Sequence, residues 1–294
     1  MTADSTDRSR FEALPDYDFE PRWLTADGVR VHYLDEGTGR PVMLFHGEPT
    51  WSFLYRKIIP PLVAAGYRAI APDYPGFGKS DKPRDPEYYT YDRHVSVMNT
   101  LVDHLDLQRT TAVVQDWGGP IGLRLAVERR DRFDRLVIMN TGLFSTHASP
   151  SPAFMQWRAF VQRTPDLPVT MVMGNAARQT WDESVYRAYE APFASADDKV
   201  GAHRFPLIVP LSADDPGAAE MLEVRRALEA WTDPALVLFA TEDPIFAPAV
   251  GQRLVDAIPG AEPLELVPDA GHFLQEDQGE AVAEHIVAFL RRSE

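Results

Sequence analysis

The sequence predicts an α/β fold in which a mostly parallel central sheet carries helices on both faces and a helical cap is inserted between two strands. Short apolar runs alternate with helix-length amphipathic segments along most of the 294 residues, a pattern typical of βαβ units. The alternation breaks off in a proline-rich stretch over residues 145–214, which we interpret as the cap. One acidic residue, Asp116, stands where an apolar run turns directly into a helix-like segment. These three observations define the fold class and the candidate site.

The strands are predicted from short apolar runs that end in turn residues. In chain order these runs are residues 29–34, 41–45, 68–71, 111–114, 135–139, 235–240 and 262–267. Helices are predicted where apolar residues recur at helical spacing, over residues 53–65, 91–107 and 121–130. Residues 1–21 show neither pattern, so we expect an irregular arm on the surface.

The core is predicted to comprise residues 1–144 and 215–294, with the cap over residues 145–214 between two core strands. The cap stretch combines seven prolines with amphipathic pieces such as residues 154–161. Ligands of open α/β sheets bind outside the carboxyl ends of the strands. A cap placed there would close a small, dry pocket.

Composition narrows the class of function. The formal net charge of -15 opposes binding to nucleic acid or to anionic membranes, because phosphate contacts require clustered Lys and Arg. With no cysteine in the chain, disulfides, thiolate zinc sites and cysteine nucleophiles are excluded. No apolar stretch reaches transmembrane length, and the N-terminus lacks the apolar segment of a signal peptide. We therefore expect a cytoplasmic protein with no nucleic-acid or membrane partner.

The sequence contains no convincing cofactor motif. Residues 78–80 resemble the end of a phosphate-binding loop, but Asp73 stands where that loop requires its upstream glycine. No His and Glu spacing typical of a metal site occurs. We expect neither a cofactor nor a metal ion.

Asp116 occupies the position of a catalytic nucleophile. Residues 113–119 pass from an apolar strand through Asp116 to two glycines and a helix, which is the context of a nucleophile elbow. A carboxylate is already ionised near neutral pH, whereas a serine would need a base. It is a poor reagent toward ordinary esters but suits displacement at a saturated carbon with a leaving group. The alternative is that Asp116 only caps the following helix.

Two further residues complete a candidate triad in the order nucleophile, acid, histidine. Asp243 lies just past the run 235–240, and His272 follows the run 262–267. Each residue alone has a structural alternative, since Asp before proline is common in turns and a single histidine is usually structural. All three at strand ends on the pocket side favour a catalytic triad.

Trp117 directly follows the nucleophile. Its indole has one donor, the ring N–H, and no acceptor. Such a donor can hold a departing anion without forming a salt bridge to Asp116. The alternative is a bulky packing residue.

Several segments together resemble one family, the haloalkane dehalogenases of the α/β-hydrolase superfamily, and in particular their first subfamily. The matching segments are residues 46–57, 70–73, 76–83, 113–119, 139–140, 191–193 and 269–273. The similarity extends from about Phe11 to the C-terminus and is weakest in the cap. The resemblance implies an α/β-hydrolase fold.

The resemblance also implies the roles of the triad. Asp116 would attack the halogen-bearing carbon and form an alkyl-enzyme ester. His272 would activate a water that attacks this ester, and Asp243 would orient His272 and stabilise its charged form. Asn140 stands where another dehalogenase subfamily places its acid. An amide cannot serve as that acid, which favours Asp243.

The resemblance further implies a halide site and an oxyanion hole. Trp117 and a cap tryptophan would hold the leaving halide, and the backbone N–H groups of Glu48 and Trp117 would form the oxyanion hole. For the cap tryptophan we predict Trp157, with Trp181 as the alternative and Trp231 assigned to the core. Packing on a helix face is the other interpretation of Trp157.

The expected function is hydrolysis of small haloalkanes to alcohol and halide. The nearest alternative is an epoxide hydrolase with the same Asp-His-Asp chemistry, for which Tyr186 and Tyr189 would activate the epoxide oxygen. A fluoroacetate-type dehalogenase would have arginine in place of Trp117, and a non-catalytic binding protein would usually lack a triad member. The expected partners are the small halogenated substrate and halide ion, with the protein a monomer or weak oligomer. Substrate length and preferred halogen depend on cap packing, which the sequence does not specify.

Overall fold

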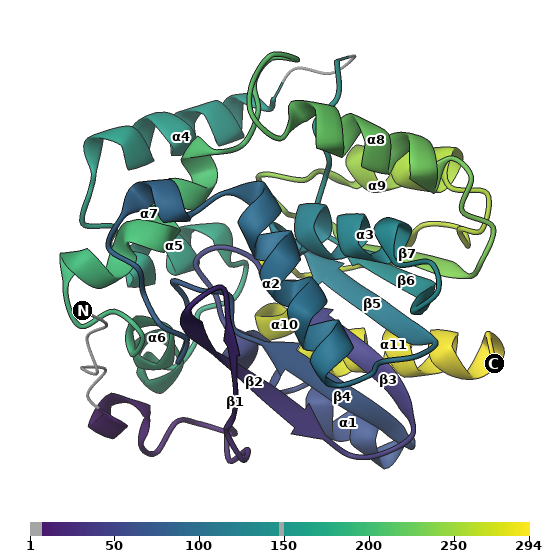
Figure 1. Ribbon diagram of the computed structural model, residues 1–294, viewed down its shortest axis with the longest axis horizontal. Coiled ribbons are helices and arrows are strands. Elements are labelled where there is room, and N and C mark those ends of the chain that lie inside the picture. Colours follow the sequence, from purple (N-terminus) through teal and green to yellow (C-terminus); the bar gives the residue numbers. More distant parts are fainter. Residues whose placement is uncertain (1–7, 147–149) are drawn as a thin grey trace.

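The computed structural model describes residues 8–146 and 150–294. Within these ranges eight strands form one sheet in the order β1-β2-β4-β3-β5-β6-β7-β8 (Figure 1). The strands are β1 (Arg22–Ala26), β2 (Val29–Glu36), β3 (Arg40–Phe45), β4 (Tyr67–Pro72), β5 (Thr110–Gln115), β6 (Phe133–Met139), β7 (Ala235–Ala240) and β8 (Glu265–Val267). The pairs β1–β2 and β2–β4 are antiparallel and the other pairs are parallel. This confirms the predicted mostly parallel sheet.

The core helices cover both faces of the sheet. Helices α1 (Ile59–Ala64) and α11 (Gly279–Arg292) pack together on one face. Helices α2 (Tyr91–His104), α3 (Gly118–Glu128) and α8 (Ala218–Leu228) pack in sequence on the other. Because both faces are covered, the central strands are buried along their whole length rather than on alternate residues, and every residue of β5 and β7 is buried. The remaining core helices are α9 (Pro248–Ala257) and α10 (Leu274–Asp277), with 3-10 turns η1 (Arg8–Phe11), η2 (Ser52–Tyr55) and η3 (Pro86–Tyr88).

The structure corrects two predicted elements. The helix expected over residues 53–65 is divided into η2 and α1, because Pro60 and Pro61 lack the amide hydrogen and are tolerated only in the first turn, where they begin α1. The strand expected over 262–267 starts only at Glu265. Pro263 precedes it, and proline cannot donate to a strand ladder.

The strand β1 was not predicted. It pairs with β2 across the two-residue turn Asp27–Gly28, whose residues have φ of 48° and 76°. Positive φ at both central residues is typical of the turns that favour Asp-Gly in tight hairpins. The Asp-Gly pair was therefore the available signal. Residues 1–7 of the expected N-terminal arm lie outside the described residues.

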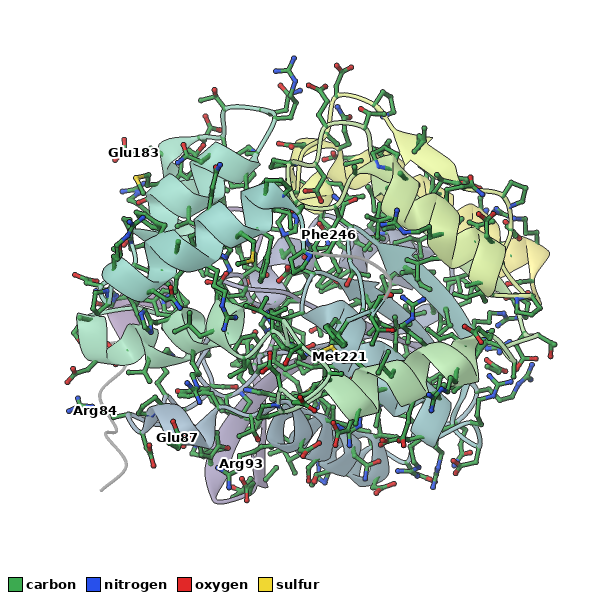
Figure 2. All side chains as sticks on the ribbon, turned by 90° about the horizontal axis from the view of Figure 1, so that it is seen from above. Arg84, Glu87, Arg93, Glu183, Met221 and Phe246 are labelled. Carbon is green, nitrogen blue, oxygen red and sulfur yellow. The ribbon has the colours of Figure 1, made fainter. Side chains whose placement is uncertain are left out.

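Between β6 and β7 the chain forms a series of short helices. These are α4 (Pro152–Arg163), α5 (Val169–Ala176), α6 (Glu183–Glu190), η4 (Ala196–Lys199), α7 (Val200–Arg204) and η5 (Phe205–Leu207). They gather at one end of the sheet (Figure 1). Figure 2 shows Met221 and Phe246, both of which line the cavity described below, near the middle of the molecule. The boundaries 145 and 214 for the cap stay a prediction, and residues 147–149 are outside the described ranges.

None of the helices in the described ranges combines the length and the apolar character needed to cross a membrane. In the same part of the chain, no three His, Asp or Glu side chains are arranged to hold a metal ion.

Candidate active site

Asp116 lies in the sharp turn between β5 and α3 with a φ of 50°. A non-glycine residue with positive φ is uncommon and costs free energy, of order 1–3 kcal/mol. The backbone of Asp116 makes two hydrogen bonds with the segment after β6, which hold the turn. The Asp116 amide donates to the carbonyl of Asn140 (3.0 Å), and the Thr141 hydroxyl donates to the carbonyl of Asp116 (2.6 Å). The strained turn projects the carboxylate away from the sheet.

Two glycines make room for this turn. A Cβ on Gly47 would lie 2.3 Å from the Cβ of Asp116, and one on Gly118 would lie 2.1 Å from the carbonyl oxygen of Phe45. Any side chain at either position would push the turn away from β3.

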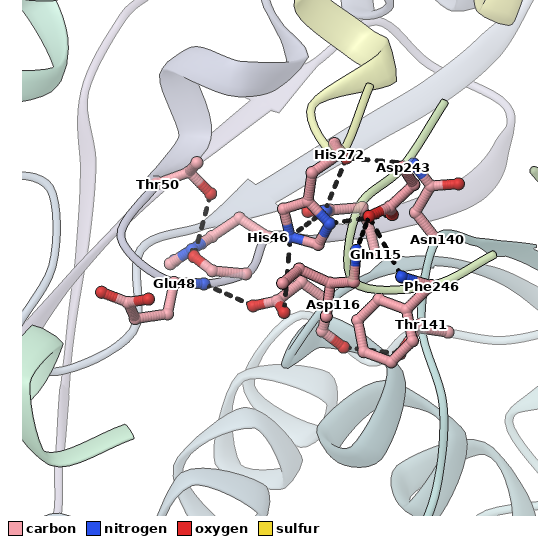
Figure 3. Close-up of polar contacts among 12 residues, drawn as sticks. His46, Glu48, Thr50, Gln115, Asp116, Asn140, Thr141, Asp243, Phe246 and His272 are labelled. Atoms are coloured by element: carbon pink, nitrogen blue, oxygen red, sulfur yellow. Dashed lines mark hydrogen bonds and ion pairs between the residues drawn. The ribbon is translucent and has the colours of Figure 1, made fainter. Parts of the chain in front are cut away.

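The Asp116 carboxylate faces two groups. Its Oδ1 accepts the backbone N–H of Glu48 at 2.8 Å, and its Oδ2 lies 3.5 Å from Nε2 of His272 (Figure 3). The side chain is 17% exposed, so it opens into the site without facing bulk solvent. No arginine is paired with it in the described part of the chain, which leaves its charge available.

His272 and Asp243 are directly paired. The Nδ1 of His272 lies 2.9 Å from Oδ2 of Asp243, and Oδ1 of Asp243 accepts the backbone N–H groups of Ile245 (2.7 Å) and Phe246 (3.1 Å). Backbone donors stabilise an ionised carboxylate, so the proton of this contact lies on Nδ1. Figure 3 shows the imidazole with Asp243 on one side and Asp116 on the other.

The protonation of His272 is set by these neighbours. Burial lowers the pKa of His272, but the negative charge of Asp243 and then the contacts with Asp116 raise it, with a net value of about 10. Two carboxylates around one buried imidazole therefore favour its charged form. Removing the charge of either carboxylate would lower the pKa of His272.

Glu48 contributes a second carboxyl group to the site. Its side chain is 7% exposed, and burial, followed by the charge of Asp116, raises its pKa well above the usual value. Both effects favour the neutral form of the Glu48 carboxyl group, in which it adds no charge beside the nucleophile. Its backbone turns through a cis peptide bond to Pro49.

A cavity of about 700 Å³ lies in front of the carboxylate. Its lining is mostly apolar and includes Asp116, Trp117 and His272 from the core and Trp157 and Phe160 from α4. An apolar cavity with a few polar groups is typical of sites for small organic molecules. The arrangement can present an anionic oxygen to a hydrophobic substrate.

Comparison with known proteins places this chain in a family. Residues 40–278 match the α/β-hydrolase fold family. A haloalkane dehalogenase from Psychrobacter cryohalolentis is 45% identical over 97% of both chains, and haloalkane dehalogenase 1 from Mycobacterium tuberculosis is 42% identical over 97% of both. The structure of haloalkane dehalogenase DpaA from Paraglaciecola agarilytica superposes with a TM-score of 0.88 at 35% identity, covering 95% of each chain. The chain belongs to the haloalkane dehalogenases.

The three other tryptophans considered in the sequence analysis differ in their surroundings. Trp157 lines the cavity and stacks on Phe160 with ring centroids 5.9 Å apart. Trp181 instead donates its N–H to Oδ1 of Asp277 (2.9 Å) and is not among the lining residues. Trp231 is buried under Arg130, whose guanidinium lies 3.6 Å from the ring centroid. This geometry favours Trp157 as the cap residue of a dehalogenase halide site.

The two tyrosines of the epoxide hydrolase alternative are placed elsewhere. Tyr189 is fully buried and its hydroxyl donates to Glu276, which also pairs with Arg56. Tyr186 stacks on Trp181. Neither tyrosine lines the cavity in the described structure. The geometry and the relatives both disfavour epoxide hydrolysis.

Two sets of contacts around His272, those of Gln115 and of Asn140, were not predicted from the sequence. Gln115 places its amide against His272, and Asn140 donates to the carbonyls of Gly271 (3.0 Å) and His272 (3.1 Å). The available signal for Gln115 was a polar amide directly after the apolar residues 112–114, at the end of β5. Burial lowers the pKa of His46 to about 4, which favours its neutral form. Its Nε2 accepts a hydrogen bond from the Tyr74 amide (3.1 Å), so His46 supports the loop that follows β4.

Proposed function

We propose that this protein converts a haloalkane and water into an alcohol, a halide ion and a proton, through an alkyl ester on Asp116. The observation that carries the proposal is the Asp116 carboxylate on a strained turn, which lines an apolar cavity and has a His-Asp pair beside it. A low dielectric strengthens the electrostatic contacts of such a carboxylate. Its relatives in sequence and structure carry the same name for this activity.

In the first step an Asp116 oxygen attacks the carbon that bears the halogen, from the side opposite the halogen. The carbon–halogen bond breaks with its electron pair, and the halide leaves. We assign the leaving halide to the indole N–H groups of Trp117 and Trp157, which line the same cavity. Hydrogen bonds to a charged partner are each worth about 1.5–3 kcal/mol.

In the second step His272 takes a proton from water, and the oxygen of that water bonds to the ester carbonyl carbon. Formation of the ester removes the negative charge of Asp116, which is one of the charges that raise the pKa of His272. Alkylation thereby lowers the pKa of His272 and favours the neutral imidazole, the form that can accept a proton in the step that follows. Asp243 stabilises the imidazolium that forms.

The oxyanion of this step is assigned to two backbone N–H groups. The Glu48 amide already donates to Oδ1 of Asp116, so it is positioned for an oxygen on the same carbon. The Trp117 amide lies at the start of α3, where the helix dipole favours negative charge. Each such donor contributes roughly 3 kcal/mol to lowering the barrier.

The proposed chemistry uses side chains and backbone alone, without a cofactor or metal. We also propose that the partners of this protein are the haloalkane and the halide, that it is cytoplasmic, and that it is a monomer or weak oligomer. The relative DpaA is described as tetrameric, so gel filtration with light scattering is the test of oligomeric state for this chain.

The deciding assay is acid and bromide release from a panel of short bromoalkanes in weak buffer, with Asp116→Ala as the control. Bromide release by the wild type and none by the variant supports the proposal. Near wild-type turnover in the variant, or hydration of styrene oxide without bromide release from 1,2-dibromoethane, contradicts it.

A further inference from the structure

Gln115 is the last residue of β5 and immediately precedes the nucleophile. It is fully buried. Its Nε2 lies 3.2 Å from Nε2 of His272 and 3.2 Å from the carbonyl oxygen of His272. Its Oε1 is buried and has no hydrogen-bond partner in the described structure. A buried, unpaired amide oxygen costs about 1–3 kcal/mol, so the position calls for a functional explanation.

The two contacts fix which way the amide faces. A carbonyl oxygen only accepts hydrogen bonds, so the Gln115 atom 3.2 Å from the His272 carbonyl must be the NH₂ group. The same NH₂ group has a second hydrogen and lies at the same distance from the imidazole Nε2. Gln115 therefore directs an N–H toward the ring nitrogen that must take a proton from water.

This N–H discriminates between the two charge states of the ring. Asp243 holds the proton of His272 on Nδ1, so in the neutral ring Nε2 carries a lone pair that can accept from Gln115. In the imidazolium Nε2 carries its own hydrogen, and the two donors oppose each other. The contact is favourable only while Nε2 is unprotonated.

We propose that Gln115 is a positioning residue that holds His272 with a free lone pair on Nε2 for the hydrolysis of the alkyl ester. This inference rests on the proposed function and deepens it. The charged groups that face the ring are Asp243 and Asp116, which both favour the imidazolium, whereas burial and the charge of Asp116 raise the pKa of Glu48 well above its usual value. The two carboxylates favour the charged form of His272, whereas the N–H of Gln115 favours its neutral form and adds no charge of its own.

The effect belongs to the second step. A proton passes from water to Nε2 as the water oxygen bonds to the ester carbon. The bond from that carbon to the alkyl oxygen then breaks, and the alkoxide takes the proton from His272 and leaves as the alcohol. The resulting Asp116 carboxylic acid loses its proton to solvent. The attack of Asp116 on the haloalkane needs no proton transfer, so Gln115 should leave that step nearly unchanged.

The test compares the full-length wild type with Gln115→Met, which keeps the side-chain length and removes the N–H. Rapid mixing with 1,2-dibromoethane separates the burst of bromide from the slower steady rate, and intact mass spectrometry measures the ester. We expect the burst to persist. The rate of ester hydrolysis rises with pH along one limb of its pH profile, and the apparent pKa of this limb should increase by about 0.5–1 unit, the effect of losing one hydrogen bond. Gln115→Glu, which places a carboxylate beside Nε2, should move the limb further upward.

Asn140→Ala is the matched control, because Asn140 supports the same His272 carbonyl (3.1 Å) without touching the ring. The Asn140→Ala variant should slow turnover without changing the apparent pKa of ester hydrolysis. An unmoved limb in Gln115→Met, or an equal movement in Asn140→Ala, overturns the inference while wild-type bromide release leaves the proposed function intact. Absence of bromide release from the wild type would instead defeat the proposed function itself.

Discussion

Nε2 of His272 lies 3.5 Å from Oδ2 of Asp116, longer than a good hydrogen bond between these atoms. His272 is nevertheless held firmly on its other side by Asp243 at 2.9 Å. Asp243 therefore fixes the position of His272, and His272 makes no close hydrogen bond to Asp116. This separation lets Asp116 react with carbon while His272 stays in place for the water of the next step.

Replacing His272 with Phe should separate the two steps. Asp116 keeps its contact with the Glu48 amide and can still form the ester, but no base remains to activate water. We expect about one bromide released per enzyme and a mass increase equal to the alkyl group, measured by intact mass spectrometry. Multiple turnovers without accumulation of the ester would contradict the assigned role.

Replacing Asp243 with Asn should remove the charge that stabilises the imidazolium and disturb the position of the Nδ1 proton. By analogy with other triads we expect turnover to fall by about 10³–10⁴-fold. The burst of bromide should fall much less than the steady rate. Stopped-flow bromide detection measures both rates in one experiment, and equal losses in the two would argue against this assignment.

The two cap tryptophans offer a matched pair of variants. Trp157→Phe should weaken bromide binding by about 10- to 100-fold, the effect of losing one hydrogen bond to an anion. Trp181→Phe should leave bromide binding within about twofold, because its N–H is engaged by Asp277. Quenching of tryptophan fluorescence by bromide gives both constants. The reverse result would assign the halide to Trp181.

The charge state of His272 should appear in the pH dependence of stability. Its pKa is raised to about 10 in the folded protein, against about 6.5 in an unfolded chain. The ion pairs of His272 therefore contribute fully below about pH 6.5, and the contribution is lost as the pH rises toward 10. We expect the difference in Tm between wild type and His272→Phe to shrink from pH 6 to pH 10. A difference that grows with pH would be inconsistent with the raised pKa.

Tyr189→Phe tests the buried contact between α6 and α10. Its hydroxyl donates to Glu276, which is also paired with Arg56. Loss of this hydrogen bond should lower the free energy of unfolding by about 1–3 kcal/mol, measured by urea denaturation. Since the tyrosine does not line the cavity, bromide release per folded enzyme should be retained. A selective loss of catalysis would revive an active role for this tyrosine.

The fold was predictable because its signals are local and repeated. Each buried parallel strand is a short, mostly apolar run. The strand predicted before Asp116, over residues 111–114, differs from β5 by one residue at each end. Where the local signal was mixed, prediction was less accurate. Residues 53–65 have a helical apolar pattern, but their prolines divide the segment, and the hairpin of β1 and β2 depends on a single Asp-Gly pair.

Chain order and strand ends determined the candidate triad from the sequence, because the carboxyl ends of parallel strands meet at one edge of a sheet. Asp116, Asp243 and His272 each follow a strand, so their proximity followed from topology. Only the tertiary structure could separate Trp157 from Trp181 or find the amide of Gln115 against the imidazole. Those distinctions depend on which way a side chain points and which group takes its hydrogen bond, and both are set by neighbours far apart in the chain.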